Sequence, residues 1–198
     1  PRASVAQPIV DSDSWPALAG CELRRVALVA KVGSGKGPDG WSNGEWRRLG
    51  GAVEPWEQVA LVVQQVMDGK GALPQAWKRS RIVLLDKQCG GTRPVCVSAT
   101  LWRLIWKALS VRLRPWLSVL CHSAQKGGIP GVTAESLLLC AVEGLEAASL
   151  GAWVPQTLEA VMSLDVAKAF DSLDYKGVWV AMGRVGYPQG VVRLLREF

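Results

Sequence analysis

The spacing of apolar and polar positions along the chain predicts mostly helices, separated by loops rich in glycine. Apolar residues that recur every three or four positions lie on one face of a helix. By this criterion, the predicted helices span residues 15–32, 41–49, 55–67, 100–118 and 175–185, with one more after Thr133 and a last one that begins at Pro188. Two other apolar runs predict short strands, at residues 79–87 and 161–164.

Three loops rich in glycine divide these elements, at residues 33–40, 90–91 and 125–131. Clusters of glycine and proline interrupt helices and strands because of their backbone preferences. The first loop contains a Gly-Lys pair, which also occurs in the phosphate-binding P-loop. A P-loop is excluded here because Ala30 stands where its first glycine belongs, and because Gly37 follows Lys36 where serine or threonine is needed.

The predicted helix at residues 100–118 has one apolar face and one basic face. The apolar face is formed by Leu101, Ile105, Ala108, Leu109 and Trp116. The opposite face carries Arg103, Lys107, Ser110 and Arg114, at spacings of four, three and four. No acidic residue between positions 100 and 119 neutralises these cations. Two interpretations stay open: a solvated helix surface, or a stripe that binds the backbone of a nucleic acid.

Charged residues also stand at both predicted strands. Arg79 and Arg81 share one face of the first strand, which is consistent either with a solvated edge or with a basic ribbon that binds phosphate. Asp165 directly follows the second strand, where a carboxylate is consistent with a turn or helix cap, or with a metal site. Because a buried charge is costly unless it is paired or bound to metal, Asp165 is a candidate functional residue.

Composition favours a folded intracellular protein with an anionic partner. The 198 residues carry a formal net charge of +6, which favours nucleic acid, and no apolar run reaches the roughly 18 residues of a membrane-spanning helix. Five scattered cysteines without a C-x-x-C pair favour a reducing compartment, the nucleus or the cytoplasm. Cys121 and His122 are adjacent, so their side chains diverge and are not expected to form a site. The sequence begins with Pro1 and its last helical pattern runs to Phe198, so we expect a fragment.

In type, order and spacing, these motifs resemble the reverse transcriptase domain of non-LTR (LINE-type) retrotransposons over residues 31–198. Within the third glycine-rich loop, Lys126 and Gly128 depart from the apolar and aromatic residues that the family more often has there. The matching segments are Lys36-Gly37-Pro38-Asp39-Gly40, Leu73-Pro74 through Lys87, Arg93-Pro94-Val95, Trp102 through Leu113, Gln125 with Gly127, and Leu164-Asp165 with Lys168-Ala169-Phe170-Asp171.

The resemblance implies roles for individual residues. Asp165 matches a catalytic metal ligand, in a site where two Mg²⁺ ions clamp the attacking hydroxyl and the leaving pyrophosphate. Arg81, Lys87 and Phe170 would bind the incoming deoxynucleoside triphosphate (dNTP). Phe170 would pack beneath the sugar of the dNTP and exclude a 2′-hydroxyl. Alternatively, Phe170 is an aromatic residue of the core. The RNA template and DNA primer would contact Arg93, Arg103, Lys107, Arg114, Gln125 and Gly127.

The resemblance also implies an α+β fold, namely the fingers and partial palm of a right-hand polymerase, helix-rich with a short mixed sheet. The implied domains are an N-terminal extension over residues 1–30, fingers over 31–150 and the start of the palm over 151–198. The implied function is RNA-directed DNA polymerisation by a retrotransposon enzyme. Without the x-Asp-Asp hairpin of that family, these residues alone are expected to be inactive. The alternative is a non-catalytic, basic RNA- or DNA-binding remnant of a mobile element.

Overall fold

A computed structural model describes residues 15–88, 90–121 and 172–198, with isolated positions and pairs of positions between Gln125 and Glu146. The described residues up to Leu113, together with Trp179–Phe198, form one compact unit, and those from Arg114 to Val178 belong to a second. The predicted strand at residues 161–164 lies outside the described residues. The domain boundaries proposed from the motifs stay a prediction.

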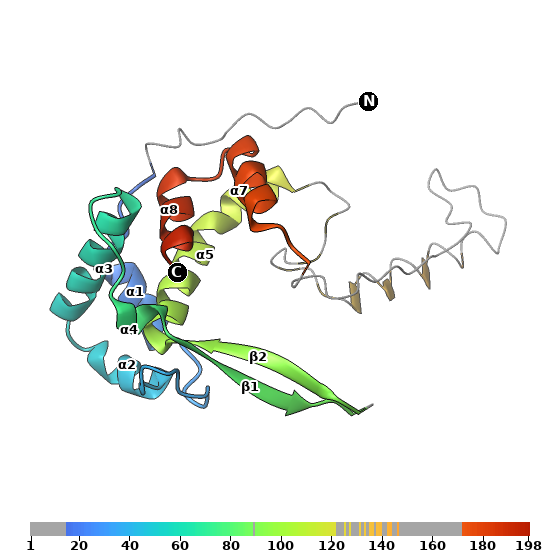
Figure 1. The fold of residues 1–198 in the computed structure, drawn as a ribbon, viewed down its shortest axis with the longest axis horizontal. Helices are drawn as coiled ribbons and strands as arrows, with labels where there is room; N and C mark the ends of the chain where they lie inside the picture. The colour runs from blue at the N-terminus through green and yellow to red at the C-terminus, as the bar shows by residue number, and fades with distance from the viewer. Residues whose placement is uncertain are drawn as a thin grey trace. The chain divides into compact units, whose positions relative to one another are not determined.

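Helices dominate the described residues and follow the predicted order (Figure 1). A helical turn before the hairpin, α4, was not predicted. After Thr133, the described positions 135–136, 138–139, 142–143 and 146 are helical as expected, and the Ser136 N–H donates to Thr133 Oγ1 at 3.2 Å. None of the described helices is long and apolar enough to cross a membrane. The elements are α1 Gly20–Leu28, α2 Asn43–Leu49, α3 Glu54–Met67, α4 Gln75–Lys78, β1 Ser80–Asp86, β2 Thr92–Ser98, α5 Thr100–Leu120, α7 Tyr175–Arg184 and α8 Gln189–Glu197.

The first helix is shorter at both ends than predicted, because α1 covers Gly20–Leu28 and not residues 15–32. The Glu22 carboxylate accepts a hydrogen bond from the Ala19 N–H at 2.9 Å, and this contact caps the helix there. Leu18 is buried although it precedes the helix. The apolar pattern reports burial, and a residue can be buried without being helical. The pattern therefore continues beyond the ends of α1.

Apolar side chains from α1, α3, α5 and α8 form the core of the first unit. Helix α3 packs against both α1 and α8. The apolar face predicted for the helix at residues 100–118 is confirmed, because all five of its residues are buried. Burial of such faces, more than intrinsic helix propensity, stabilises helices of this length. The largest fully buried side chains include Trp56, Leu23, Ile105, Leu109 and Leu194.

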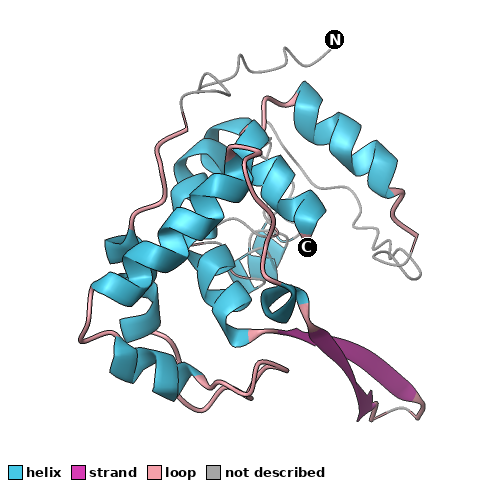
Figure 2. Cartoon of the chain, turned by 60° about the vertical axis from the view of Figure 1, so that its left-hand side comes forward, coloured by secondary structure: helices cyan, strands magenta, loops and turns pink. Residues whose placement is uncertain are grey.

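The two strands form an antiparallel hairpin that projects from the helices of its unit (Figure 2). β1 matches the predicted strand, and the predicted glycine turn is confirmed: Gly90 and Gly91 have φ angles of 88° and 82°, in the left-handed region that glycine adopts without strain. β2 was not predicted, because it contains Pro94, a residue that cannot donate a ladder hydrogen bond and so weakens the strand signal. The described sheet is therefore antiparallel.

Arg112 ties α5 to α1 and to the segment ahead of it. Its Nε donates a hydrogen bond to Glu22 Oε1 at 2.6 Å, and an Nη of the same guanidinium bonds the other carboxylate oxygen. The guanidinium also donates to the carbonyl oxygens of Pro16 and Ala17. Because both charged side chains are partly buried, this contact is expected to contribute more than an exposed ion pair does.

We expect this ion pair to make the protein less stable in acid. The Arg112 hydrogen bond lowers the pKa of Glu22 below its ordinary 4.5. A lowered carboxyl pKa stabilises the folded protein above the unfolded pKa, and this contribution of about 1 kcal/mol is lost as the pH falls through the folded value. Urea unfolding between about pH 6 and pH 3 measures the effect. The pKa values of Glu45, Asp68 and Glu197 are lowered too, so these groups also make stability depend on pH. The contribution of Glu22 is the difference in pH dependence between the parent protein and the Glu22→Gln variant. Equal pH dependence in the two proteins would contradict the prediction.

Candidate nucleic-acid interface

Residues 33–40, here called the glycine loop, cap the N-terminus of α5. Asp39 Oδ2 accepts a hydrogen bond from the Leu101 N–H at 3.2 Å. Thr100 Oγ1 accepts from the Gly37 N–H at 3.0 Å and donates to the Trp41 carbonyl oxygen at 2.6 Å. The first N–H groups of a helix have no partner within the helix, so a carboxylate there satisfies one of them. The segment that resembles the family's first motif is thus bonded to the helix that carries the basic stripe.

Two of the predicted site arginines meet at this glycine loop. Arg81, near the base of β1, donates through Nη2 to the Lys36 carbonyl oxygen at 3.1 Å. Arg103, on α5, donates through Nη2 to the Gly35 carbonyl oxygen at 2.8 Å and to Thr100 Oγ1 at 2.8 Å. The structure therefore brings a predicted triphosphate ligand and a predicted template ligand to neighbouring peptide groups. Each arginine keeps further N–H groups for other acceptors.

Lys87 and Arg93 lie at the other end of the hairpin. They line a hollow of about 380 Å³ at its tip, together with Leu85, Asp86 and Gln88. Lys87 is six residues beyond Arg81, which at the rise of a strand corresponds to roughly 20 Å. The structure therefore places Lys87 beside Arg93 and apart from Arg81, and their individual roles stay predictions.

Arg103 and Lys107 form a ridge on α5 between two hollows. The first, here called the apolar hollow, has a volume of about 470 Å³ and lies between α1 and α5. The second, here called the aromatic hollow, has a volume of about 270 Å³ and lies on the other side of the ridge. Arg114 is exposed and belongs to the second unit. The aromatic hollow is lined by Ser98, Trp102, Arg103, Trp106, Lys107 and Ser110, and the apolar hollow mainly by Val26, Val29, Ala30, Leu104, Ala108 and Val111.

Gln125 and Gly127 are bonded to each other, since Gln125 Nε2 donates to the Gly127 carbonyl oxygen at 3.0 Å. Both positions lie outside helices and strands, as predicted for this loop. The carboxamide oxygen of Gln125 is not used in that contact and could accept a hydrogen bond from a ligand. Their predicted contact with the template stays a prediction.

Asp165 and Phe170, the predicted catalytic and sugar-contacting residues, lie outside the described residues. Within the described part of the chain, no three histidine, cysteine, aspartate or glutamate side chains lie close enough to hold a metal ion. Whether the residues around Asp165 fit two Mg²⁺ ions is therefore a prediction from the sequence alone.

The aromatic hollow was not predicted from the sequence, in which ten tryptophans at the spacing of core residues are typical of packing. Trp102 and Trp106 are four residues apart, so they share a face of α5, and each is followed directly by a cation, Arg103 or Lys107. That repeated pair, an aromatic residue with an adjacent cation one helical turn apart, is the signal that could have revealed the site. It can be distinguished from ordinary packing only when the exposure of Trp106 is known.

Comparison with known proteins links the chain to a mobile element. No model of a known protein family matches it. The chain is 30% identical, over 133 residues, to the Retrovirus-related Pol polyprotein from type-1 retrotransposable element R2 of Popillia japonica. The match covers 61% of this chain and 17% of the polyprotein, so the chain spans less than a fifth of that relative. The similarity supports a retrotransposon-related origin.

Proposed function

From this retrotransposon-related origin, we propose that the chain is the fingers and the beginning of the palm of an RNA-directed DNA polymerase. The meeting of Arg81 and Arg103 on the glycine loop carries the proposal, because it unites three segments that resemble polymerase motifs. These segments lie far apart in the sequence. Their contact is expected if they position one template and one incoming nucleotide.

The described residues would bind substrates and leave the chemistry to the region around Asp165. Arg81 is exposed, and a guanidinium with one N–H on the Lys36 carbonyl oxygen still has N–H groups that bind phosphate oxygens in pairs. Arg103, Lys107 and Arg114 would contact the phosphate backbone of the template irrespective of base sequence. Arg81 would thus bind the triphosphate from its position beside the glycine loop.

Asp165 would be one ligand of the Mg²⁺ ions, which supply electrostatic stabilisation of the attacking and leaving oxygens. Phe170 would pack beneath the sugar of the incoming nucleotide and exclude a 2′-hydroxyl. Two divalent ions need more oxygen ligands than one aspartate provides. We therefore expect the 198 residues to lack polymerase activity unless further carboxylates complete the site.

Primer extension by a complete polyprotein that contains this chain tests the proposal. With an RNA template, a DNA primer, dNTPs and Mg²⁺, we expect DNA synthesis that Asp165→Ala reduces by about 100-fold or more, because several kcal/mol of transition-state stabilisation are lost. Asp68→Ala is the matched control, since that carboxylate is exposed at the end of α3 and bonds only Gln64 and Lys70 among the described residues. Full activity of the Asp165 variant would rule out the assigned role.

A second candidate function is RNA or DNA binding without catalysis. The ridge of Arg103 and Lys107 favours it, because these cations need no metal site to contact phosphate. In that case the complete protein would bind nucleic acid in a salt-dependent manner and extend no primer. The two candidates thus differ in one assay, primer extension.

A further inference from the structure

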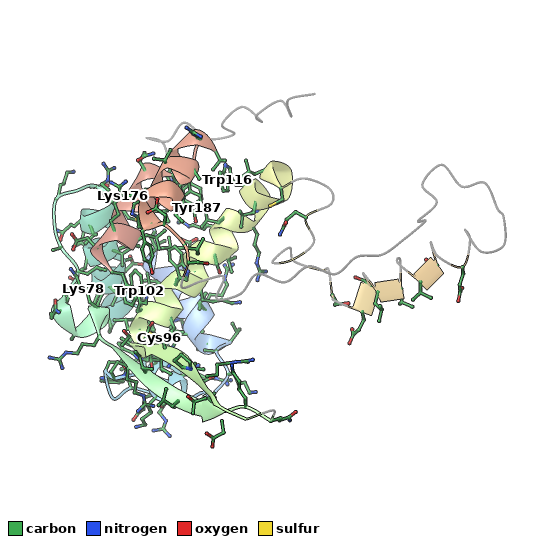
Figure 3. All side chains as sticks on the ribbon, turned by 45° about the vertical axis from the view of Figure 1, so that its right-hand side comes forward. Lys78, Cys96, Trp102, Trp116, Lys176 and Tyr187 are labelled. Carbon is green, nitrogen blue, oxygen red and sulfur yellow. The ribbon has the colours of Figure 1, made fainter. Side chains whose placement is uncertain are left out.

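The two tryptophans that line the aromatic hollow belong to a stack of rings. The ring centroids of Trp102 and Trp106 are 6.1 Å apart and their planes differ by 11°. Phe198 also stacks on Trp102, with centroids 4.4 Å apart and an angle of 4° (Figure 3 labels Trp102 on α5). The three rings are therefore nearly parallel, which is the arrangement that a further flat ring can extend.

Trp106 is the partly exposed ring that lines the aromatic hollow beside the cations, whereas Phe198 is 42% exposed but is not one of its lining residues. Trp102 is 6% exposed and packs in the core, whereas Trp106 is only partly buried and lines the hollow. An indole in such a hollow offers a flat, apolar surface on which another ring can stack. Burial of a further flat ring against it would be favourable.

The other residues of the hollow suit an anion that is attached to such a ring. Arg103 and Lys107 are cations, Ser98 and Ser110 carry hydroxyl groups, and no lining residue is acidic. Among the described residues, the Lys107 amine makes no hydrogen bond or ion pair, so its charge is available to a ligand. The Arg103 Nε is buried and has no hydrogen-bond partner among the described residues, so Lys107 is the cation whose charged group is free to contact an anion. A flat ring joined to phosphate matches both halves of the hollow.

We propose that the aromatic hollow binds one unpaired nucleotide of a nucleic-acid strand, with its base stacked on Trp106 and its phosphate on Lys107. This inference deepens the proposed function. It rests on that function only for the assignment of the bound strand as the template. The base must be unpaired, because a base within a duplex has both faces covered by its neighbours. An apolar protein segment is a poorer occupant, since it would desolvate two cations without compensation.

The test compares the binding of two oligonucleotides of about 12 nucleotides to the 198-residue chain: a fluorescent oligouridylate, and an abasic oligomer of the same length and charge. We expect the oligouridylate to bind more tightly. Trp106→Leu should weaken its binding by about 5- to 150-fold, and should bring the two affinities together because only the stacked base is lost. Trp106→Tyr, which keeps an aromatic face, should retain most of the difference.

The salt dependence of binding separates stacking from charge. Lys107→Ala should reduce the slope of log affinity against log salt by about 0.7, because one phosphate contact is removed, and Trp106→Leu should leave that slope unchanged. Trp41→Leu is the matched control, since Trp41 is exposed but lines a different hollow with Trp46 and Trp77. It should change neither affinity nor slope. Urea unfolding of each variant shows whether the fold is kept.

An affinity difference between the two oligonucleotides that persists in Trp106→Leu, or no binding of either by the parent chain, overturns the inference. Failure of the proposed function is observed separately. If the complete polyprotein extends no primer but the Trp106-dependent difference is present, the hollow binds an unpaired nucleotide and the polymerase proposal alone is wrong. If primers are extended but Trp106 has no effect on binding, only the inference fails.

Discussion

Gly37→Ala is expected to lower the free energy of unfolding by about 2–3 kcal/mol. The new Cβ would lie 2.6 Å from the Thr100 nitrogen and 2.8 Å from the Ser98 carbonyl oxygen. Both are backbone atoms where β2 meets α5, so neither can move without displacing an element, and forcing extra atoms into such a packed site costs about 1–3 kcal/mol. The displacement would also break the hydrogen bond from the Gly37 N–H to Thr100 Oγ1. The expected loss therefore lies at the upper end of that range.

Gly35→Ala provides the matched control for Gly37→Ala. A Cβ at Gly35 would have no neighbouring atom within 4 Å, so its effect should stay within about 0.5 kcal/mol. Urea unfolding, monitored by circular dichroism, gives the free energy of each variant from its midpoint. If both alanine variants were equally stable, the close packing of the glycine loop on α5 would be refuted.

Trp56→Ala is expected to destabilise the protein by about 3–5 kcal/mol, the range measured when a large aromatic residue is removed from a core. Trp56 lies on α3, is 1% exposed and has its ring centroid 5.6 Å from that of Trp46. Its Nε1 donates to the Leu49 carbonyl oxygen at 3.3 Å, at the end of α2. Alanine would leave a cavity and remove this contact. Small domains have about 5–15 kcal/mol of stability, so much of the total would be lost.

Leu61→Ala, on the same helix, separates burial from helix propensity. Leu61 is 52% exposed, and alanine is at least as favourable in a helix, so we expect a loss below about 1 kcal/mol. Thermal unfolding followed by circular dichroism compares the two variants with the parent chain. Similar losses for both substitutions would mean that Trp56 does not pack as the structure places it.

Local patterns predicted the helices well, and their ends less well. The apolar face of α5 follows the period of 3.6 residues, and its buried residues Leu101, Ile105 and Leu109 are those that the pattern selects. The ends of α1 were wrong, because the Glu22 side chain caps the helix after Ala19 while Leu18 stays buried outside it. Helix ends depend on individual side-chain contacts, which a periodic pattern does not report.

The hairpin shows a second limit of local patterns. β1 has β-branched and leucine residues, and was predicted, yet Ile82 is 71% exposed and Leu84 is 64% exposed. The apolar run therefore predicted the extended backbone of β1 correctly, but it did not predict that these side chains are exposed. β2 was missed because Pro94 weakens its local signal, and because its pairing with β1 forms only in the folded chain.

The sequence by itself determined the order of helices and glycine-rich loops, the basic stripe with Arg103 and Lys107, and the motif resemblance that the retrotransposon relative supports in its coarser form. These features depend on residues within a few positions of one another. Only the tertiary structure brought Arg81 and Arg103 to the glycine loop and left Trp106 partly open beside Lys107. The physical reason is that contacts between distant residues depend on the packing of whole elements, and local periodicity shows which face is buried but not against what.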